Sequence, residues 1–134
     1  MNLKQRAAVI LLDDNKNILL MHRLKNGKEY YAIPGGCIED EESPEETAVR
    51  ELKEETNLDI SLGKMLWEFE DEYHHGYYFL ADKYAGTATL GGPELEGNNK
   101  ENFYELQWVP IRKLNEMLLY PEEISRRIQD IFLI

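Results

Sequence analysis

The first part of the chain alternates short apolar runs with turn residues. Apolar runs cover residues 7–12 and 18–21 and are separated by the polar run 13–17. This pattern predicts two strands joined in a hairpin. Asn26-Gly27 is a strong turn signal, and residues 29–33 after it have the composition of a further strand. We therefore expect β-structure up to about residue 33.

A helix is predicted next, because both of its ends carry recognisable capping residues. Ser43 is a good N-cap, Pro44 suits the first helical position, and Glu46 completes a Ser-x-x-Glu capping box. Asn57 tolerates the left-handed conformation that ends a helix. The face expected to pack on a sheet consists of Ala48, Val49 and Leu52.

The remainder of the chain predicts three strands and two further helices. Strand-like segments cover 65–70, 77–80 and 103–109, and helical apolar spacing covers 111–119 and 122–132, with a break at Pro121. Residues 86–102 are polar and glycine-rich, which indicates a weak strand and a long loop. The resulting fold class is α+β or α/β, an α/β/α sandwich with a mixed β-sheet between helices.

Composition narrows the possible partners. The chain has 26 acidic and 15 basic residues and a formal net charge of −11, which disfavours duplex nucleic acid and anionic membranes as partners. Its one cysteine excludes an internal disulfide. Without a run of 18 apolar residues or a signal peptide, the expected location is cytoplasmic. At 134 residues the expectation is a single domain, 1–134.

The predicted helix carries carboxylates on one face. Glu51, Glu54 and Glu55 fall within an arc of roughly 100°. Like charges at this spacing cost a helix about 0.2–0.5 kcal/mol per pair, and a cation would offset that cost. Hard oxygen donors of this kind suit Mg²⁺ or Mn²⁺. The alternative is an acidic helix face that is simply solvated.

The segment from Gly36 to Leu58 resembles the Nudix box, the sequence signature of the Nudix (MutT-like) hydrolases. Gly36 is followed after five residues by Glu42 and, after seven more, by the run Arg-Glu-Leu-Lys-Glu-Glu-Thr-Asn-Leu over 50–58. The family usually has glycine at the position of Asn57. Because asparagine also adopts the left-handed conformation, the helix end is expected to survive this difference.

This resemblance implies hydrolysis of a nucleoside diphosphate linked to another group, by attack of water on phosphorus with Mg²⁺ or Mn²⁺ bound. Matched onto this chain, the metal ligands are Glu54, Glu55, the Gly35 carbonyl, and Glu51 as a ligand or general base. Arg50 is expected to orient Glu51, and Glu42 to brace the loop. Which glutamate is the base stays open.

Several residues outside the box are candidates for additional roles. Glu101 lies before the strand at 103–109, where some family members place an extra metal-binding or catalytic glutamate, and Glu96 is the alternative. Arg23 and Arg6 lie on or beside strands that approach the site in this family and are candidates for binding phosphate oxygens. Tyr31 is a candidate for stacking on a nucleobase, although aromatic residues in strands also serve the core.

The sequence leaves the substrate and the assembly state open. Nucleoside triphosphates, including oxidised ones, are the leading class by analogy with the family. The alternatives are ADP-ribose, a nucleotide sugar, a dinucleoside polyphosphate, or a nucleotide sensor without turnover. The apolar end at 131–134 packs either in the core or against a second subunit, so a homodimer is also open.

Overall fold

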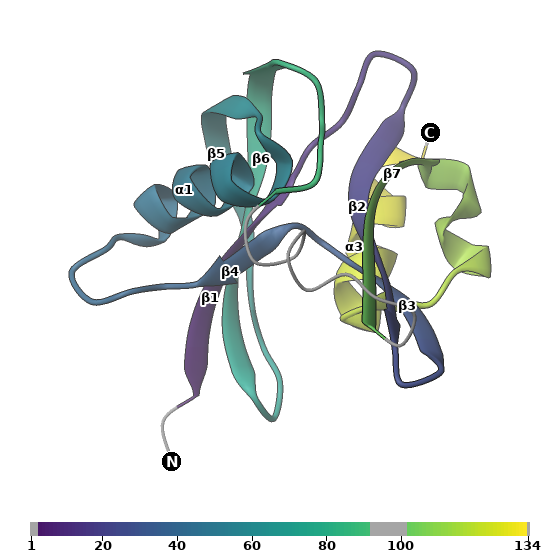
Figure 1. The fold of residues 1–134 in the computed structure, drawn as a ribbon, viewed down its shortest axis with the longest axis horizontal. Coiled ribbons are helices and arrows are strands. Elements are labelled where there is room, and N and C mark those ends of the chain that lie inside the picture. Colours follow the sequence, from purple (N-terminus) through teal and green to yellow (C-terminus); the bar gives the residue numbers. More distant parts are fainter. Residues whose placement is uncertain (1–2, 92–101, 134) are drawn as a thin grey trace. The chain divides into compact units, whose positions relative to one another are not determined.

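The computed structural model describes residues 3–91 and 102–133 of the chain, in the elements drawn in Figure 1. The chain divides into two compact units, and each is described by itself. The first unit comprises residues 1–10 and 34–89, and the second comprises residues 11–33 and 90–134.

The first unit is a four-stranded mixed sheet that packs against a helix. Its strand order is β4-β1-β6-β5, in which β1 runs parallel to β6 and antiparallel to β4, and β5 runs antiparallel to β6. The elements are β1 (Lys4–Ile10), β4 (Gly35–Cys37), α1 (Pro44–Thr56), β5 (Asp59–Glu70) and β6 (His74–Ala85). Both β5 and β6 are longer than the sequence predicted.

The predicted hairpin between residues 7–12 and 18–21 is wrong for β1. That strand pairs with β4 and β6. Beyond its end, Leu12 bridges to Ile18, and backbone hydrogen bonds join Leu19 to Leu11 and Asp13 to Asn17. The turn itself exists, because the Asp13 carboxylate accepts hydrogen bonds from the backbone N–H groups of Asn15 and Asn17. Residues 7–10 are all buried, as expected of a central strand covered on both faces. The chain therefore passes from one sheet to the other at this turn.

The second unit holds the other four-stranded mixed sheet, of order β7-β2-β3-β8. The Asn26-Gly27 turn is confirmed: both residues have positive φ, 51° and 82°, and they join β2 to β3 as a hairpin. The elements are β2 (Asn17–Lys25), β3 (Lys28–Ala32), β7 (Asn102–Pro110), a 3₁₀ helix η1 (Ile111–Glu116), β8 (Leu119–Tyr120) and α3 (Glu122–Phe132).

The helix predicted over 111–119 is corrected to this short 3₁₀ helix followed by β8, whereas α3 confirms the helix predicted over 122–132. Residues 119–120 pair with β3 in parallel. These backbone groups therefore bond to a neighbouring strand instead of continuing a helix. The strand predicted over 103–109 is confirmed as β7.

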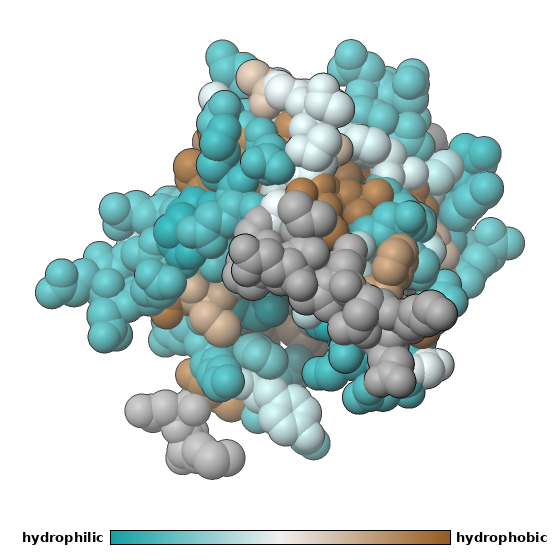
Figure 2. All heavy atoms as spheres, viewed as in Figure 1, coloured by the Kyte–Doolittle hydropathy of each residue, from teal (hydrophilic) through white to brown (hydrophobic). Residues whose placement is uncertain are grey.

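Helix α1 begins and ends where its capping residues predicted. The Ser43 hydroxyl accepts from the Glu46 N–H at 3.1 Å, and the Glu46 carboxylate accepts from the Ser43 N–H at 2.9 Å. Asn57 is left-handed, with φ 62°. The helix packs on β1, β4 and β5, and the surface around it is mainly hydrophilic (Figure 2).

The predicted packing face of α1 needs one correction. Val49 is 41% exposed, whereas Thr47 and Thr56 are fully buried beside Ala48 and Leu52. The buried Thr56 hydroxyl donates to the Leu52 carbonyl, so its polar group is satisfied inside the helix. Hydrophobicity alone therefore misplaced the edge of the buried face by one residue.

His75 connects the start of β6 to the end of β5 through two carboxylates. Its Nδ1 lies 3.1 Å from a Glu70 oxygen and its Nε2 lies 3.2 Å from a Glu68 oxygen. Hydrogen bonding to Glu70, with Glu68 adding to it, raises the pKa of His75 above its ordinary value of 6.5. The protonated imidazole is thus favoured in the folded state.

We predict that His75 makes stability depend on pH near neutrality. Because the folded-state pKa is raised, the stabilisation is fully present below about pH 6.5 and is lost as pH rises through the higher folded value. This pH dependence is measured by urea unfolding of the wild type and of His75→Gln between about pH 5.5 and 8.5, a range that brackets the ordinary histidine pKa. The difference in unfolding free energy should shrink with rising pH, and a constant difference would contradict the assignment. His74→Gln is the control in the same turn.

Candidate active site

Arg50 on α1 gathers carboxylates from two segments. Its Nε and Nη2 donate to the two oxygens of Glu42 at 2.6 and 2.9 Å, a two-pronged contact. Its Nη1 donates to Glu51 at 3.0 Å and to both oxygens of Glu54 at 3.3 Å. One guanidinium therefore holds together the loop before α1 and the acidic face of that helix.

Glu42 is the most strongly held carboxylate of this cluster. Besides Arg50, it accepts from the Thr47 hydroxyl at 2.7 Å and from the Glu39 N–H at 3.1 Å. The hydrogen bonds from Arg50 and then Thr47 lower its pKa from 4.5 to about 2, and the same contact raises the pKa of Arg50. Glu42 thus braces the loop, as the family resemblance implied.

The two glycines of β4 allow close approaches on two sides: Gly36 faces Glu51 of α1, and Gly35 faces Ala7 and Ala8 of β1. A side chain at Gly36 would collide with the carboxylate of Glu51, so that carboxylate lies directly over the glycine. The Gly35 N–H donates to Glu55 at 3.0 Å, and Glu55 is only 6% exposed. Glycine at 36 is therefore required by the position of Glu51.

The structure brings together five of the predicted site residues in the first unit: Gly35, Arg50, Glu51, Glu54 and Glu55. Their burial differs, since Glu55 is buried, the Glu51 side chain is 17% exposed and that of Glu54 is 48% exposed. Glu54 is thus the carboxylate most open to solvent. Arg6, also in this unit, lies on β1 opposite Cys37 of β4.

Arg23 and Tyr31 belong to the second unit. Arg23 lies on β2 between Tyr104 and Tyr30, with its guanidinium carbon 3.9 and 5.7 Å from their ring centres. Its buried Nε has no hydrogen-bond partner among residues 3–91 and 102–133. Tyr31 stacks on His22 at 4.7 Å. Burial, with the nearby charges of Glu29 and Glu105, raises the pKa of Tyr31.

Glu101 and its alternative Glu96 lie outside the described residues. Sequence reasoning also missed two contributors to the site, the Thr47 hydroxyl and the Cys37 carbonyl, which accepts from Arg50 Nη2 at 3.3 Å. A backbone carbonyl leaves no signal in the sequence. For Thr47, the available signal was its position in the first turn of the predicted helix, close to the loop that holds Glu42.

A metal-binding role was tested against the arrangement of the donors. Within 3–91 and 102–133, no group of three or more His, Cys, Asp or Glu side chains is arranged to hold a metal ion. The donor chemistry nevertheless fits a hard cation, because Glu51 and Glu54 both turn toward the same cationic nitrogen of Arg50. In this structure the positive charge between the carboxylates of Glu51 and Glu54 is the guanidinium of Arg50.

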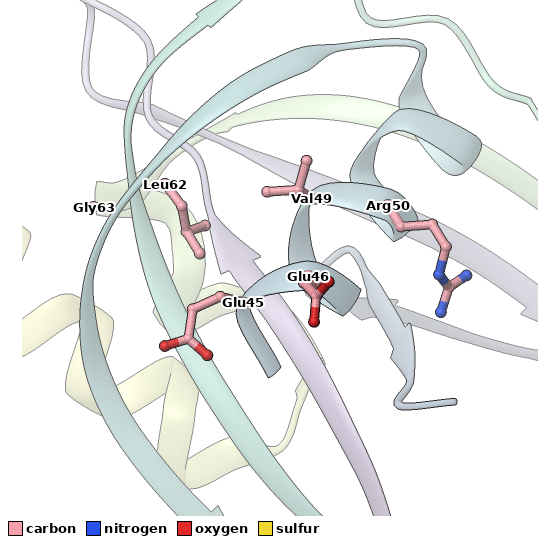
Figure 3. Close-up of a pocket in the computed structure, with 6 residues that line it drawn as sticks. All are labelled: Glu45, Glu46, Val49, Arg50, Leu62 and Gly63. Atoms are coloured by element: carbon pink, nitrogen blue, oxygen red, sulfur yellow. The ribbon is translucent and has the colours of Figure 1, made fainter. Parts of the chain in front are cut away.

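An open depression of about 520 Å³ lies between the first turns of α1 and β5 (Figure 3). Its lining residues are Glu45, Glu46, Val49, Arg50, Leu62 and Gly63. Val49 and Leu62 form its apolar part, and Arg50 is the one predicted site residue in that lining. The depression is therefore a neighbour of the carboxylate cluster and does not enclose it.

Comparison with known proteins agrees with this geometry. The family model described as the NUDIX domain matches residues 3–128. A putative 8-oxo-dGTP diphosphatase of Bacillus subtilis is 32% identical over 94% of this chain and 78% of its own length. An ADP-ribose pyrophosphatase of Methanocaldococcus jannaschii is 45% identical over 75% of this chain and 61% of its own.

Another relative, a CMP-5'-(N-acetyl-N-hydroxy-3-aminopropyl)phosphonate hydrolase of Streptomyces rubellomurinus, is 31% identical over 84% of this chain, which spans about half (54%) of that protein. Among solved structures, one from a study of MutT of Aliivibrio salmonicida and Vibrio cholerae superimposes with a TM-score of 0.77, at 20% identity and 98% coverage of both chains. This likeness confirms the predicted α/β/α fold, here with mixed sheets. Sequence, fold and family model together place the chain in the Nudix hydrolase family.

Proposed function

We propose that this protein is a divalent-metal-dependent pyrophosphohydrolase that converts a nucleoside triphosphate, including an oxidised one, to the monophosphate and pyrophosphate. The observation that carries the proposal is the carboxylate cluster around Arg50, set against the Gly35-Gly36 strand. Relatives named 8-oxo-dGTP diphosphatase, from Bacillus subtilis (as putative) and Proteus vulgaris, support the substrate class.

The proposed metal ligands are Glu51, Glu54, Glu55 and the Gly35 carbonyl, with Glu101 as a further ligand from outside the described residues. Mg²⁺ or Mn²⁺ at such a site would neutralise phosphate charge and lower the pKa of a bound water. Glu54 is the most exposed of these carboxylates, which suits it to meet an incoming metal–nucleotide complex. Glu55, held by the Gly35 N–H, is fixed before any ligand arrives.

Arg50 and Glu51 have the proposed catalytic roles beside Glu54. Arg50 is itself oriented by the two oxygens of Glu42, so its Nη1 is directed at Glu51 and Glu54. This arrangement holds the Glu51 carboxylate over Gly36 of β4, which supports the proposal that Glu51 is a metal ligand or a general base. Catalysis of this type depends on such preorganised charge.

For substrate binding we propose Arg23, Arg6 and Tyr31. Arg23 is the best supported, because its buried Nε finds no hydrogen-bond partner in the part of the chain that the structure describes, and a buried polar group left unpaired is costly. A phosphate oxygen would supply the missing partner. Tyr31 offers an aromatic ring for a nucleobase, although His22 already covers one of its faces.

A second candidate function is hydrolysis of ADP-ribose. It is favoured by the 45% identity to the Methanocaldococcus jannaschii protein of that name. The chemistry would use the same carboxylates, and only the group beyond the pyrophosphate link would differ. Nucleotide sugars, dinucleoside polyphosphates and a sensor without turnover are the remaining outcomes of a substrate screen.

We also propose that residues 1–134 form a single Nudix domain, which the family model over 3–128 supports. The proposed location of the protein is the cytoplasm, and the proposed assembly is a homodimer. The chain's net charge of −11 disfavours duplex nucleic acid and anionic membrane as partners, and it is consistent with a small nucleotide that arrives together with a metal ion. Among the described residues, no helix is long and apolar enough to cross a membrane.

The function is tested by a hydrolysis screen with Mg²⁺ or Mn²⁺ against nucleoside triphosphates, their 8-oxo forms, ADP-ribose, nucleotide sugars and dinucleoside polyphosphates. Release of pyrophosphate from a triphosphate is the expected result. We predict that Glu54→Gln and Glu55→Gln each lower kcat by at least about a hundredfold with unchanged circular dichroism. Glu45→Gln, an exposed acid on the same helix, is the matched control. Near-normal rates in both site variants would remove the metal assignment.

Arg23→Gln is predicted to raise KM for the best substrate about tenfold or more, because a charged partner for a phosphate oxygen is lost. Initial-rate kinetics measure it. Arg126→Gln, which removes an exposed arginine of α3, should leave KM unchanged. An unaltered KM in Arg23→Gln would show that this arginine serves only its stack with Tyr104 and Tyr30.

Glu42→Gln is predicted to destabilise the protein in a pH-dependent manner. Because the pKa of Glu42 is lowered from 4.5 to about 2, the stabilisation from its charge is fully present above pH 4.5 and is lost as pH falls toward 2. Wild type and variant are compared by urea unfolding at about pH 7, 4.5 and 3, values that span the titration of a carboxyl group. Their difference in unfolding free energy should shrink on acidification. Equal differences at all three values would refute the charge-assisted contact.

A further inference from the structure

Asn57 does more than end helix α1. Its backbone is left-handed, and its N–H donates to the Lys53 carbonyl at 3.0 Å. Its side-chain Nδ2 donates to both the carbonyl and the hydroxyl oxygen of Thr89, each at 2.9 Å. The Thr89 N–H in turn donates to the Thr56 carbonyl at 2.9 Å. Three hydrogen bonds thus join the end of α1 to the segment after β6.

That segment is shaped to reach the helix end. Gly86, the first residue after β6, has φ +107°, and a side chain placed on it would stand 3.5 Å from the Asn57 carbonyl oxygen. Residues 86–89 therefore turn back over the end of α1. The three hydrogen bonds between Asn57, Thr56 and Thr89 are called the Asn57 clamp below.

A glycine at position 57 would end the helix at least as well, since it adopts the left-handed conformation without cost. Glycine has no amide group and can make neither bond to the Thr89 oxygens. What asparagine adds to this chain is therefore the connection to Thr89. We infer that Asn57 is a positioning residue, which holds the last turn of α1 in place for the reaction through Thr89.

The last turn of α1 is where such positioning matters. Helices leave their final carbonyls without partners inside the helix, and the Thr89 N–H occupies the Thr56 carbonyl. Of the two acids just before it, Glu55 is held by the Gly35 N–H at 3.0 Å, whereas Glu54 accepts from Arg50 at the longer distance of 3.3 Å. Fraying of the turn would therefore displace Glu54 most.

The first test is a double-mutant cycle that needs no enzymatic activity. Asn57→Gly and Thr89→Val are made singly and together, and hydrogen exchange of the Thr89 amide and urea unfolding are measured. We expect each single variant to speed exchange about three- to tenfold. The effect of the double variant should fall short of the two combined, because Thr89→Val removes only the hydroxyl acceptor and leaves the Thr89 carbonyl to Asn57. The effect of glycine on the unfolded chain cancels in the cycle. Additive effects, or unchanged exchange, would overturn the clamp.

Two further variants control for other causes. Thr89→Ser keeps the hydroxyl acceptor and should behave as wild type. Asn57→Asp keeps a residue that tolerates the left-handed conformation but removes the donor, so it should reproduce the exchange of Asn57→Gly. If Asn57→Asp instead matched wild type, the side-chain donor would be irrelevant and the inference wrong.

The kinetic part rests on the proposed function. With the best substrate and saturating Mg²⁺, Asn57→Gly should lower kcat severalfold (about three- to tenfold) and leave KM unchanged. The displaced Glu54 is a proposed metal ligand, whereas the proposed substrate-binding residues Arg23, Arg6 and Tyr31 are not displaced. A raised KM with a normal kcat, or no kinetic change, would reject the positioning role, even if hydrogen exchange shows that the clamp exists. If the wild type hydrolyses nothing in the screen, the proposed function fails while the exchange cycle still decides whether the clamp exists.

Discussion

The contact between Arg50 and its carboxylates is the interaction on which the rest of the site depends. Glu42, Glu51 and Glu54 surround one guanidinium, and without it three negative charges would be left facing one another. Their side chains are partly exposed, and water screens both the repulsion and the attraction. The value of the contact therefore lies less in stability than in geometry, because one planar cation sets the direction of three acids at once.

That geometry requires the neighbouring strand β4 to lack a side chain at position 36. The Glu51 carboxylate fills the space over Gly36, and the Gly35 N–H points at Glu55. Helix α1 is thus attached to β4 through its acids and not only through apolar packing. The buried residues Ala48, Leu52 and Thr56 lie beside the buried Glu55 and pack in the core, and the acids help to determine how the helix is rotated on the sheet.

The sequence could predict the features that depend on nearby residues. The ends of α1, the turn at Asn26-Gly27 and the glycines of the box all follow from conformational preferences within a few positions. The partners of β1 could not be predicted, because strand pairing is decided by residues distant in the chain. The burial of Thr47 and Thr56 in place of Val49 escaped for another reason: their hydroxyl groups are satisfied locally, at Glu42 and Leu52, which removes the cost of burying them.

The same distinction explains why the reaction is easier to infer than the substrate. The acids and glycines of the first unit lie in one continuous stretch of sequence, so a short motif records them. Arg23 is flanked by Tyr30 from β3 and Tyr104 from β7, a combination assembled from three strands that no short motif describes. A relative named for 8-oxo-dGTP and a relative named for ADP-ribose both match this chain. This is expected if the residues that they share with the chain lie mainly in the motif. Substrate choice must then be sought in side chains such as Arg23, whose neighbours only the fold brings together.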